Sequence, residues 1–220
     1  MIIVAIDEID LKKASTIIDN LDPYKCMVKI GSVSFNSIGH EIIYYAAKKG
    51  FEIFLDLKLH DIPNTVKKSI EGLTSLPISM LTVHTSGGTD MMIAAMQAVK
   101  NTRIKVFGVT ALTSLNDEDT INIFKRSSSQ QVNAMLDLAI SAGIDGVVCS
   151  PHELKLVSLR KSLLSITPGI RIQDSNDDQK RVMTPKEAIN SGSDFLVIGR
   201  PITSSSNIKK SLNEIYKSIQ

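Results

Sequence analysis

Short apolar runs recur along this chain of 220 residues, and a segment with helical periodicity follows each of them. Runs with few polar interruptions are typical of parallel strands that are covered on both faces. Their spacing, roughly 25 residues from one run to the next, is that of βαβ units. The expected strands are residues 2–6, 26–30, 52–57, 79–83, 104–109, 145–149, 164–167 and 195–198.

Helices are expected between these strands, where apolar residues repeat every three or four positions. Asp10 is a suitable N-cap for the first helix, Gly50 a suitable end for the second, and Pro63 a suitable start for the third. The expected helices are residues 10–21, 38–49, 63–73, 91–99, 117–124, 130–142, 185–191 and 208–219, with a short helix that ends near residue 159.

Eight strands that alternate with helices predict an α/β protein with the (β/α)8 architecture, the TIM barrel, as a single domain over residues 1–220. A doubly wound open sheet is the alternative fold. That fold requires a glycine-rich turn after the first strand, and the segment Asp7-Glu8-Ile9-Asp10 contains no glycine. The barrel is therefore the expected fold.

Charge and cysteine content exclude several classes of protein. The formal net charge is +2 and no basic run is interleaved with aromatic residues, which argues against a nucleic-acid partner. Cys26 and Cys149 lie in apolar runs, which indicates buried thiols in a reducing compartment. No run approaches the ~20 apolar residues of a membrane span, and no basic leader precedes residues 2–6. We expect a soluble, cytoplasmic protein with no membrane partner.

The third expected strand differs from the others because charged residues lie in it and directly after it. Read by parity, Leu55 and Leu57 share one face, whereas Asp56 and Lys58 share the other. Such alternation usually marks a half-exposed strand, but the neighbouring runs are apolar on both faces. Opposite charges in a partly buried strand are costly unless paired, and paired charges in a cleft are more often a functional site than a source of stability.

Polar residues gather at the carboxyl ends of the expected strands, where barrels of this kind carry their chemistry. Gly199 and Arg200 follow the eighth strand, where backbone N–H groups and a forked cation are suited to phosphate. Arg171 directly precedes a polar loop, residues 172–181, and Gln179 lies in it; both could close over the same ligand. The residues at this rim are Asp7, Lys29, Asp56, Lys58, Asp61, His84, Thr113, Arg171 and Arg200.

The histidines and cysteines are weaker candidates for chemistry. His84 is a possible base, although a histidine at a strand end is more often structural, and His60 and His152 weigh less. No spacing of His, Cys, Asp and Glu makes a convincing metal site. The apolar surroundings of both cysteines argue against a thiol nucleophile.

One segment carries a family resemblance: Asp56-Leu57-Lys58-Leu59-His60-Asp61-Ile62-Pro63-Asn64-Thr65 resembles the signature of the orotidine 5′-phosphate decarboxylase family. Its Asp-x-Lys-x-x-Asp element alone is shared with sugar-phosphate decarboxylases and aldolases of the same superfamily. More specific are further matches along the chain, among them Val83-His84-Thr85-Ser86-Gly87-Gly88, Thr167-Pro168-Gly169-Ile170-Arg171 and Val197-Ile198-Gly199-Arg200-Pro201-Ile202.

The resemblance implies decarboxylation of orotidine 5′-monophosphate to UMP and CO2, the last step of de novo pyrimidine biosynthesis, without a cofactor or metal. Lys58 would protonate C6 of the carbanion, and Asp56 would lie beside the departing carboxylate. Lys29 and Asp7 would hold the ribose hydroxyls. The implied catalytic residues are Lys29, Asp56, Lys58 and Asp61.

The resemblance also implies a homodimer with shared sites, in which Asp61, Ile62 and Thr65 reach into the partner's site. Further substrate contacts would come from Thr113 at the pyrimidine and from Arg171, Gln179, Gly199 and Arg200 at the phosphate.

Two other functions stay open. A metal-assisted decarboxylase or aldolase acting on a keto-sugar phosphate would share the barrel and the phosphate site. It would need a divalent metal and extra carboxylate ligands in place of Lys29 and Thr113. A catalytically silent module would bind UMP without turnover, although buried charges that serve no purpose are a liability.

Overall fold

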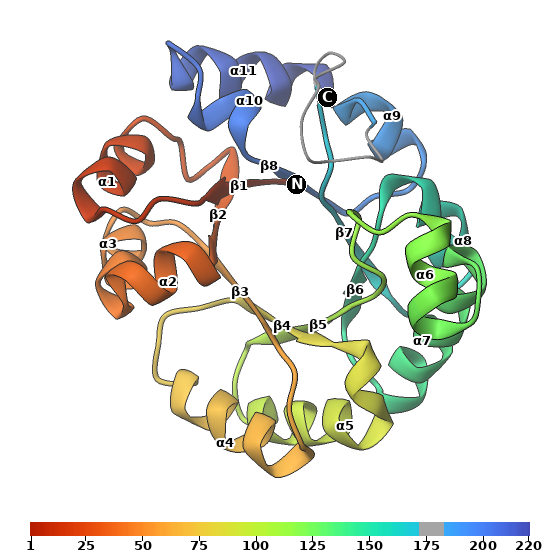
Figure 1. The fold of residues 1–220 in the computed structure, drawn as a ribbon. Helices are drawn as coiled ribbons and strands as arrows, with labels where there is room; N and C mark the ends of the chain where they lie inside the picture. Colours follow the sequence, from red (N-terminus) through yellow and green to blue (C-terminus); the bar gives the residue numbers. More distant parts are fainter. Residues whose placement is uncertain (172–182) are drawn as a thin grey trace.

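Eight parallel strands close into a barrel in chain order in the computed structural model, which describes residues 1–171 and 183–220 (Figure 1). The first strand pairs with both the second and the last, so the two ends of the sheet meet. The predicted TIM barrel is confirmed. The strands are β1 (Ile2–Ile6), β2 (Cys26–Gly31), β3 (Ile53–Leu59), β4 (Met80–His84), β5 (Lys105–Val109), β6 (Gly146–Val148), β7 (Leu164–Thr167) and β8 (Phe195–Ile198).

The helices form a ring around the barrel (Figure 1). Capping follows ordinary rules, since the Asp10 side chain accepts a hydrogen bond at the start of the first helix and Pro63 is the first residue of the fourth. The helices are α1 (Leu11–Asp19), α2 (Ser32–Ile38), α3 (His40–Lys48), α4 (Pro63–Leu73), α5 (Gly88–Val99), α6 (Asp117–Phe124), α7 (Ser128–Ala142), α8 (Leu154–Ser158), α9 (Pro185–Asn190), α10 (Arg200–Thr203) and α11 (Ile208–Ser218), with 3-10 turns η1 (Thr85–Gly87) and η2 (Pro151–Glu153).

Apolar side chains fill two layers, one between the strands and the helices and one inside the barrel. Ile43 and Leu136 are fully buried in the outer layer. In the inner layer the rings of Phe54 and Phe107 meet edge to face, with centroids 6.4 Å apart. Because both faces of each strand are covered, the strands read in sequence as nearly continuous apolar runs.

Two short helices, α2 and α10, have no counterpart among the helices expected from the sequence. The single helix expected over residues 38–49 begins at His40, and α2 precedes it, separated by Gly39 with a φ of 76°. Only Ser34 of α2 is buried, so that helix has no apolar stripe for a periodicity argument to detect. The other expected bounds lie within three residues of those observed. The polar loop expected over residues 172–181 lies outside the described residues.

β3 is irregular near its carboxyl end. Leu55 pairs with Leu81 and Leu59 pairs with Val83, so four steps along β3 match two steps along β4. Lys58, inside this bulge, has a φ of 53°, which is uncommon for a residue other than glycine. The bulge therefore interrupts the regular alternation of side chains at the residue on which the predicted chemistry depends.

In the described part of the chain, no helix has both the length and the apolar character that crossing a membrane requires.

Candidate active site

A pocket of about 420 Å³ opens at the carboxyl ends of the strands. Its wall combines apolar residues of the barrel interior, such as Phe54 and Ile166, with charged residues from the strand ends. A pocket with this size and mixed wall suits a small-molecule ligand. The predicted site residues that line it are Asp7, Lys29, Asp56, Lys58, Thr113, Arg171, Gly199 and Arg200.

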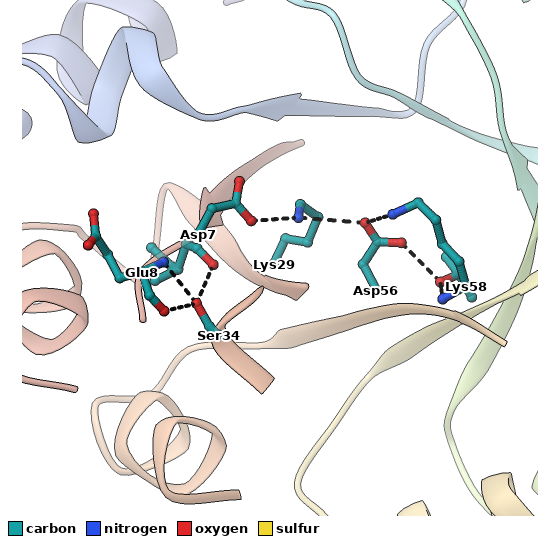
Figure 2. Close-up of polar contacts among 8 residues, drawn as sticks. Asp7, Glu8, Lys29, Ser34, Asp56 and Lys58 are labelled. Atoms are coloured by element: carbon teal, nitrogen blue, oxygen red, sulfur yellow. Dashed lines mark hydrogen bonds and ion pairs between the residues drawn. The ribbon is translucent and has the colours of Figure 1, made fainter. Parts of the chain in front are cut away.

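Four of these side chains, Asp7, Lys29, Asp56 and Lys58, form a row of alternating charge, here called the charged row (Figure 2). The Lys29 ammonium lies 3.3 Å from Asp7 Oδ1 and 3.6 Å from Asp56 Oδ2. The Lys58 ammonium donates to the same Asp56 oxygen at 2.7 Å. The opposite charges predicted to pair at the third strand therefore do so, and the pairing extends to Lys29 in β2 and to Asp7, directly after β1.

Asp56 is the centre of the charged row, and its side chain is nearly buried. Burial by itself raises the pKa of Asp56. The ammonium groups of Lys29 and Lys58, together with hydrogen bonds from Lys58 and Thr82, outweigh that effect and hold the pKa below its ordinary value. The carboxylate is therefore ionised at neutral pH, and the row presents fixed positive and negative groups to the pocket.

Thr82 is a residue of this site that sequence reasoning misses. It lies in β4 and is fully buried. Its hydroxyl donates to Asp56 Oδ1 at 3.0 Å and accepts from the backbone nitrogen of Lys58 at 2.9 Å. Because a threonine inside an apolar strand reads as core packing, no signal in the sequence distinguishes it.

Ser34, in the unpredicted helix α2, holds the loop that carries Asp7. Its hydroxyl accepts from the backbone nitrogen of Glu8 at 3.0 Å. It lies 2.9 Å from the carbonyl oxygen of Ile6 and 2.7 Å from that of Glu8, to either of which it can donate (Figure 2). These bonds fasten the backbone on both sides of Asp7 and so position its carboxylate beside Lys29.

Gly31, at the end of β2, leaves space for the Lys29 ammonium. A Cβ atom at this position would lie 2.9 Å from Lys29 Nζ and 3.4 Å from Asp7 Oδ1. The absence of a side chain at Gly31 is therefore part of the geometry of the charged row, and sequence reasoning did not select it.

The predicted phosphate residues line the β7–β8 side of the pocket. Gly199 is the N-cap of α10, and Arg200 is the first residue of that helix and is exposed. Arg171 follows β7 and is nearly buried, at 8% exposed. Thr113 lies in the loop after β5 and also faces the pocket. Gln179 lies outside the described residues.

Three predicted residues, Asp61, Ile62 and Thr65, do not line the pocket of their own chain. All three are exposed, and Ile62, an apolar residue, is 67% exposed. Asp61 Oδ1 accepts a hydrogen bond from the backbone nitrogen of Ile62. Their position after β3 and on the first turn of α4 leaves their side chains accessible from outside the chain.

The remaining candidates lie away from the pocket wall. The rings of His60 and His84 are 5.3 Å apart, and burial together with the nearby His60 and Lys58 lowers the pKa of His84. His152 is exposed. Cys26 and Cys149 are free and buried as predicted, and burial raises the pKa of Cys26 to about 12. Among residues 1–171 and 183–220, no three His, Cys, Asp or Glu side chains form a group that could hold a metal ion.

Comparison of the sequence with known families gives one match over nearly the whole chain. The family described as Orotidine 5′-phosphate decarboxylase / HUMPS matches residues 1–215. A curated relative from Wolbachia pipientis, named orotidine 5′-phosphate decarboxylase, is 46% identical over 221 residues, which cover 99% of this chain and 98% of the relative.

Solved structures with the same fold include relatives with the same name. The crystal structure of orotidine 5′-phosphate decarboxylase from Lactobacillus acidophilus is 35% identical, covers 100% of this chain and 98% of its own, and has a TM-score of 0.88. The orotidine 5′-monophosphate decarboxylase from Methanocaldococcus jannaschii, solved with the inhibitor BMP, covers 100% of this chain and 98% of its own with a TM-score of 0.81. At 22% identity, that second likeness concerns the fold alone. These matches do not favour the metal-assisted alternative.

Proposed function

The chain belongs to the orotidine 5′-phosphate decarboxylase / HUMPS family, and on that premise we propose that it decarboxylates orotidine 5′-monophosphate to UMP and CO2 in pyrimidine biosynthesis. The observation that carries this proposal is the charged row, in which two ammonium groups and two carboxylates alternate across one pocket at 2.7–3.6 Å.

The chemical difficulty of this reaction is the electron pair left on C6 of the pyrimidine when CO2 departs. No adjacent carbonyl or iminium group delocalises that charge. In the proposed mechanism the Lys58 ammonium faces C6 and stabilises the charge as it forms. The Coulomb energy of two opposite unit charges ~4 Å apart is about 4 kcal/mol at an effective dielectric near 20. Lys58 then transfers a proton to C6, so that UMP forms without a cofactor or metal.

Asp56 has two parts in this mechanism. Its carboxylate holds the Lys58 ammonium in place, and it lies beside the substrate carboxylate that is lost as CO2. Because the charges are fixed before substrate arrives, no reorganisation is required during the reaction. Lys29 joins Asp56 to Asp7, and we assign Lys29 and Asp7 to the ribose hydroxyls.

The phosphate end of the substrate is assigned to the β7–β8 side of the pocket. Arg171 and Arg200 supply guanidinium groups, which bind phosphate through paired N–H donors. Gly199 lets the phosphate oxygens approach backbone N–H groups, and Gln179 would add a further contact. Thr113 is assigned to the pyrimidine. Binding energy from the phosphate, remote from C6, drives closure of the site.

We further propose a homodimer in which Asp61, Ile62 and Thr65 complete the partner's site. Support comes from their exposure beside the pocket-forming strand β3, and from the apolar residue Ile62, which is 67% exposed. Two buried free thiols, Cys26 and Cys149, fit a reducing compartment, so we place the protein in the cytoplasm.

The direct test follows the absorbance change of orotidine 5′-monophosphate in the presence of EDTA. Turnover is expected in the wild type, and Lys58→Ala should lose about a thousandfold or more in kcat because the charge-stabilising group is gone. Lys12→Ala, an exposed lysine on α1, is the matched control and should keep wild-type kcat. A wild type without turnover would refute the proposed function, and an active Lys58→Ala would refute the role of the lysine.

A further inference from the structure

A threonine hydroxyl from β4 lies against the charged row. Thr82 Oγ1 is 3.0 Å from Asp56 Oδ1 and 2.9 Å from the backbone nitrogen of Lys58. The backbone N–H of Lys58 can only donate, so the hydroxyl accepts from it and gives its own single proton to the carboxylate. The direction of both hydrogen bonds is therefore fixed.

These bonds close a ring through Asp56 and Lys58. Asp56 Oδ1 binds the Thr82 hydroxyl, and Asp56 Oδ2 binds the Lys58 ammonium at 2.7 Å. The two carboxylate oxygens have different partners, so rotation of the carboxylate would break one bond or the other. The same hydroxyl also holds the backbone of Lys58, whose positive φ of 53° needs support from its surroundings.

We infer that Thr82 is a positioning residue, whose hydroxyl holds Asp56 and Lys58 at the fixed separation that the decarboxylation needs. This inference rests on the proposed function. Thr82 is not among the described residues that line the pocket, so it acts through the other two. A misplacement of about 1 Å in a catalytic group costs on the order of a hundredfold in rate, which is the scale of effect expected here.

The test compares Thr82→Val, which replaces the hydroxyl with a methyl group, with Thr82→Ser, which retains the hydroxyl. Thr85→Val is the matched control, since Thr85 is also fully buried and its hydroxyl donates to the carbonyl oxygen of Val109 at 2.8 Å. We expect kcat to fall about tenfold to a hundredfold in Thr82→Val and to stay within about threefold in Thr82→Ser and Thr85→Val. The affinity of Thr82→Val for UMP should be unchanged, because the ribose and phosphate contacts are assigned to other residues.

A second measurement does not depend on activity. Loss of the Thr82 hydrogen bond should raise the pKa of the Asp56 carboxyl, which 13C NMR follows during a pH titration. If Thr82→Val does not melt cooperatively, Thr82→Ala replaces it with the same expectations.

The outcomes separate the inference from the proposed function. Wild-type kcat in Thr82→Val, an equal loss in Thr82→Ser, or an equal loss in Thr85→Val would each overturn the inference. If the wild type itself does not turn over orotidine 5′-monophosphate, the proposed function fails, and the NMR titration alone tests whether Thr82 holds Asp56. An unchanged Asp56 pKa in Thr82→Val would then overturn the inference about Thr82.

Discussion

At the scale of single residues, the site depends on atoms that serve several partners at once. Asp56 Oδ2 faces the ammonium groups of both Lys29 and Lys58, at 3.6 and 2.7 Å. Burial of charges on this scale is tolerated only when each is paired and hydrogen-bonded. Small changes next to these atoms that leave the ion pairs intact should therefore affect function more than stability.

Gly31→Ala is such a change. The added Cβ would lie 2.9 Å from Lys29 Nζ, and because this atom is the end of a flexible side chain, it should move aside without unfolding the protein. If Lys29 holds the ribose, KM for orotidine 5′-monophosphate should rise by up to about tenfold, the equivalent of one hydrogen bond. Gly72→Ala is the control, since nothing lies within 4 Å of a Cβ there, and steady-state kinetics on both variants make the comparison. Equal KM values for both would argue against a crowded Lys29.

Asp56 should also contribute to the pH dependence of stability. Its pKa in the folded protein is below the ordinary value, so its contribution is fully present above the unfolded pKa, near 4, and is lost as pH falls through the folded pKa. Urea denaturation of the wild type below pH 4 should therefore show a fall in the free energy of unfolding. The fall should be shallower in Asp56→Asn by at most about 1.4 kcal/mol per pH unit, the effect of one proton. Parallel curves would contradict the lowered pKa.

The identity of the charged residues could be predicted from the sequence, but their geometry could not. Parity places Asp56 and Lys58 on one face only if β3 is regular, and the positive φ of Lys58 breaks that assumption. Thr82 and Gly31 carry no charge and stand in apolar surroundings, so their contribution depends on contacts between strands that only the folded chain brings together.

At the scale of elements, helix starts with reciprocal caps fix several loops of the ring. In α7 the Ser127 hydroxyl accepts from the backbone nitrogen of Gln130 at 3.4 Å, and the Gln130 side chain accepts from the backbone nitrogen of Ser127 at 3.1 Å. Similar capping boxes begin α6 and α9. They explain why these helices start within two residues of their expected positions.

Ser127→Ala should lower the free energy of unfolding by about 1 kcal/mol, because it removes the acceptor for an orphan N–H of α7. The exposed Ser129, two residues later, is the matched position, and Ser129→Ala should change stability by less than about 0.5 kcal/mol. Urea denaturation followed by circular dichroism measures both. An equal loss of unfolding free energy in the two variants would show that the cap is not responsible. Neither substitution should change kcat.

Strands were more predictable than short helices for a physical reason. A strand in a closed parallel barrel is buried on both faces, and its sequence is therefore a nearly continuous apolar run that can be recognised. α2 buries only Ser34 and α10 is four residues long, so neither leaves a periodic pattern. Both nevertheless support the site, α2 through the loop of Asp7 and α10 through its N-cap, Gly199.

At the scale of the whole molecule, the barrel brings residues from seven of its strands or strand ends to one pocket, while Asp61, Ile62 and Thr65 are exposed and do not line it. A complete site, as proposed, then requires two copies of the chain. Self-complementary interfaces of this kind are common in homodimers with two-fold symmetry.

Mixing subunits tests the shared site. Lys58→Ala and Asp61→Ala should each be nearly inactive alone, but a heterodimer of the two contains one intact site. Random reassortment should therefore restore about a quarter of wild-type activity per subunit. Lys58→Ala mixed with Asp56→Asn is the control and should recover nothing, because both residues belong to the same chain's half of the site. Activity no higher than in this control would reject the shared arrangement.

The charged row contains two cations and two anions, and so it has no net charge. A ligand with a phosphate and a carboxylate gains little long-range attraction from it, and the guanidinium groups of Arg171 and Arg200 must provide the field that draws the ligand in. Arg200 is exposed, so dissolved salt screens its field over about 8–10 Å, whereas the contacts of the nearly buried Asp56 with Lys29 and Lys58 are short and are screened much less. Ionic strength should thus govern how fast ligand arrives and leave the bond-breaking step nearly untouched.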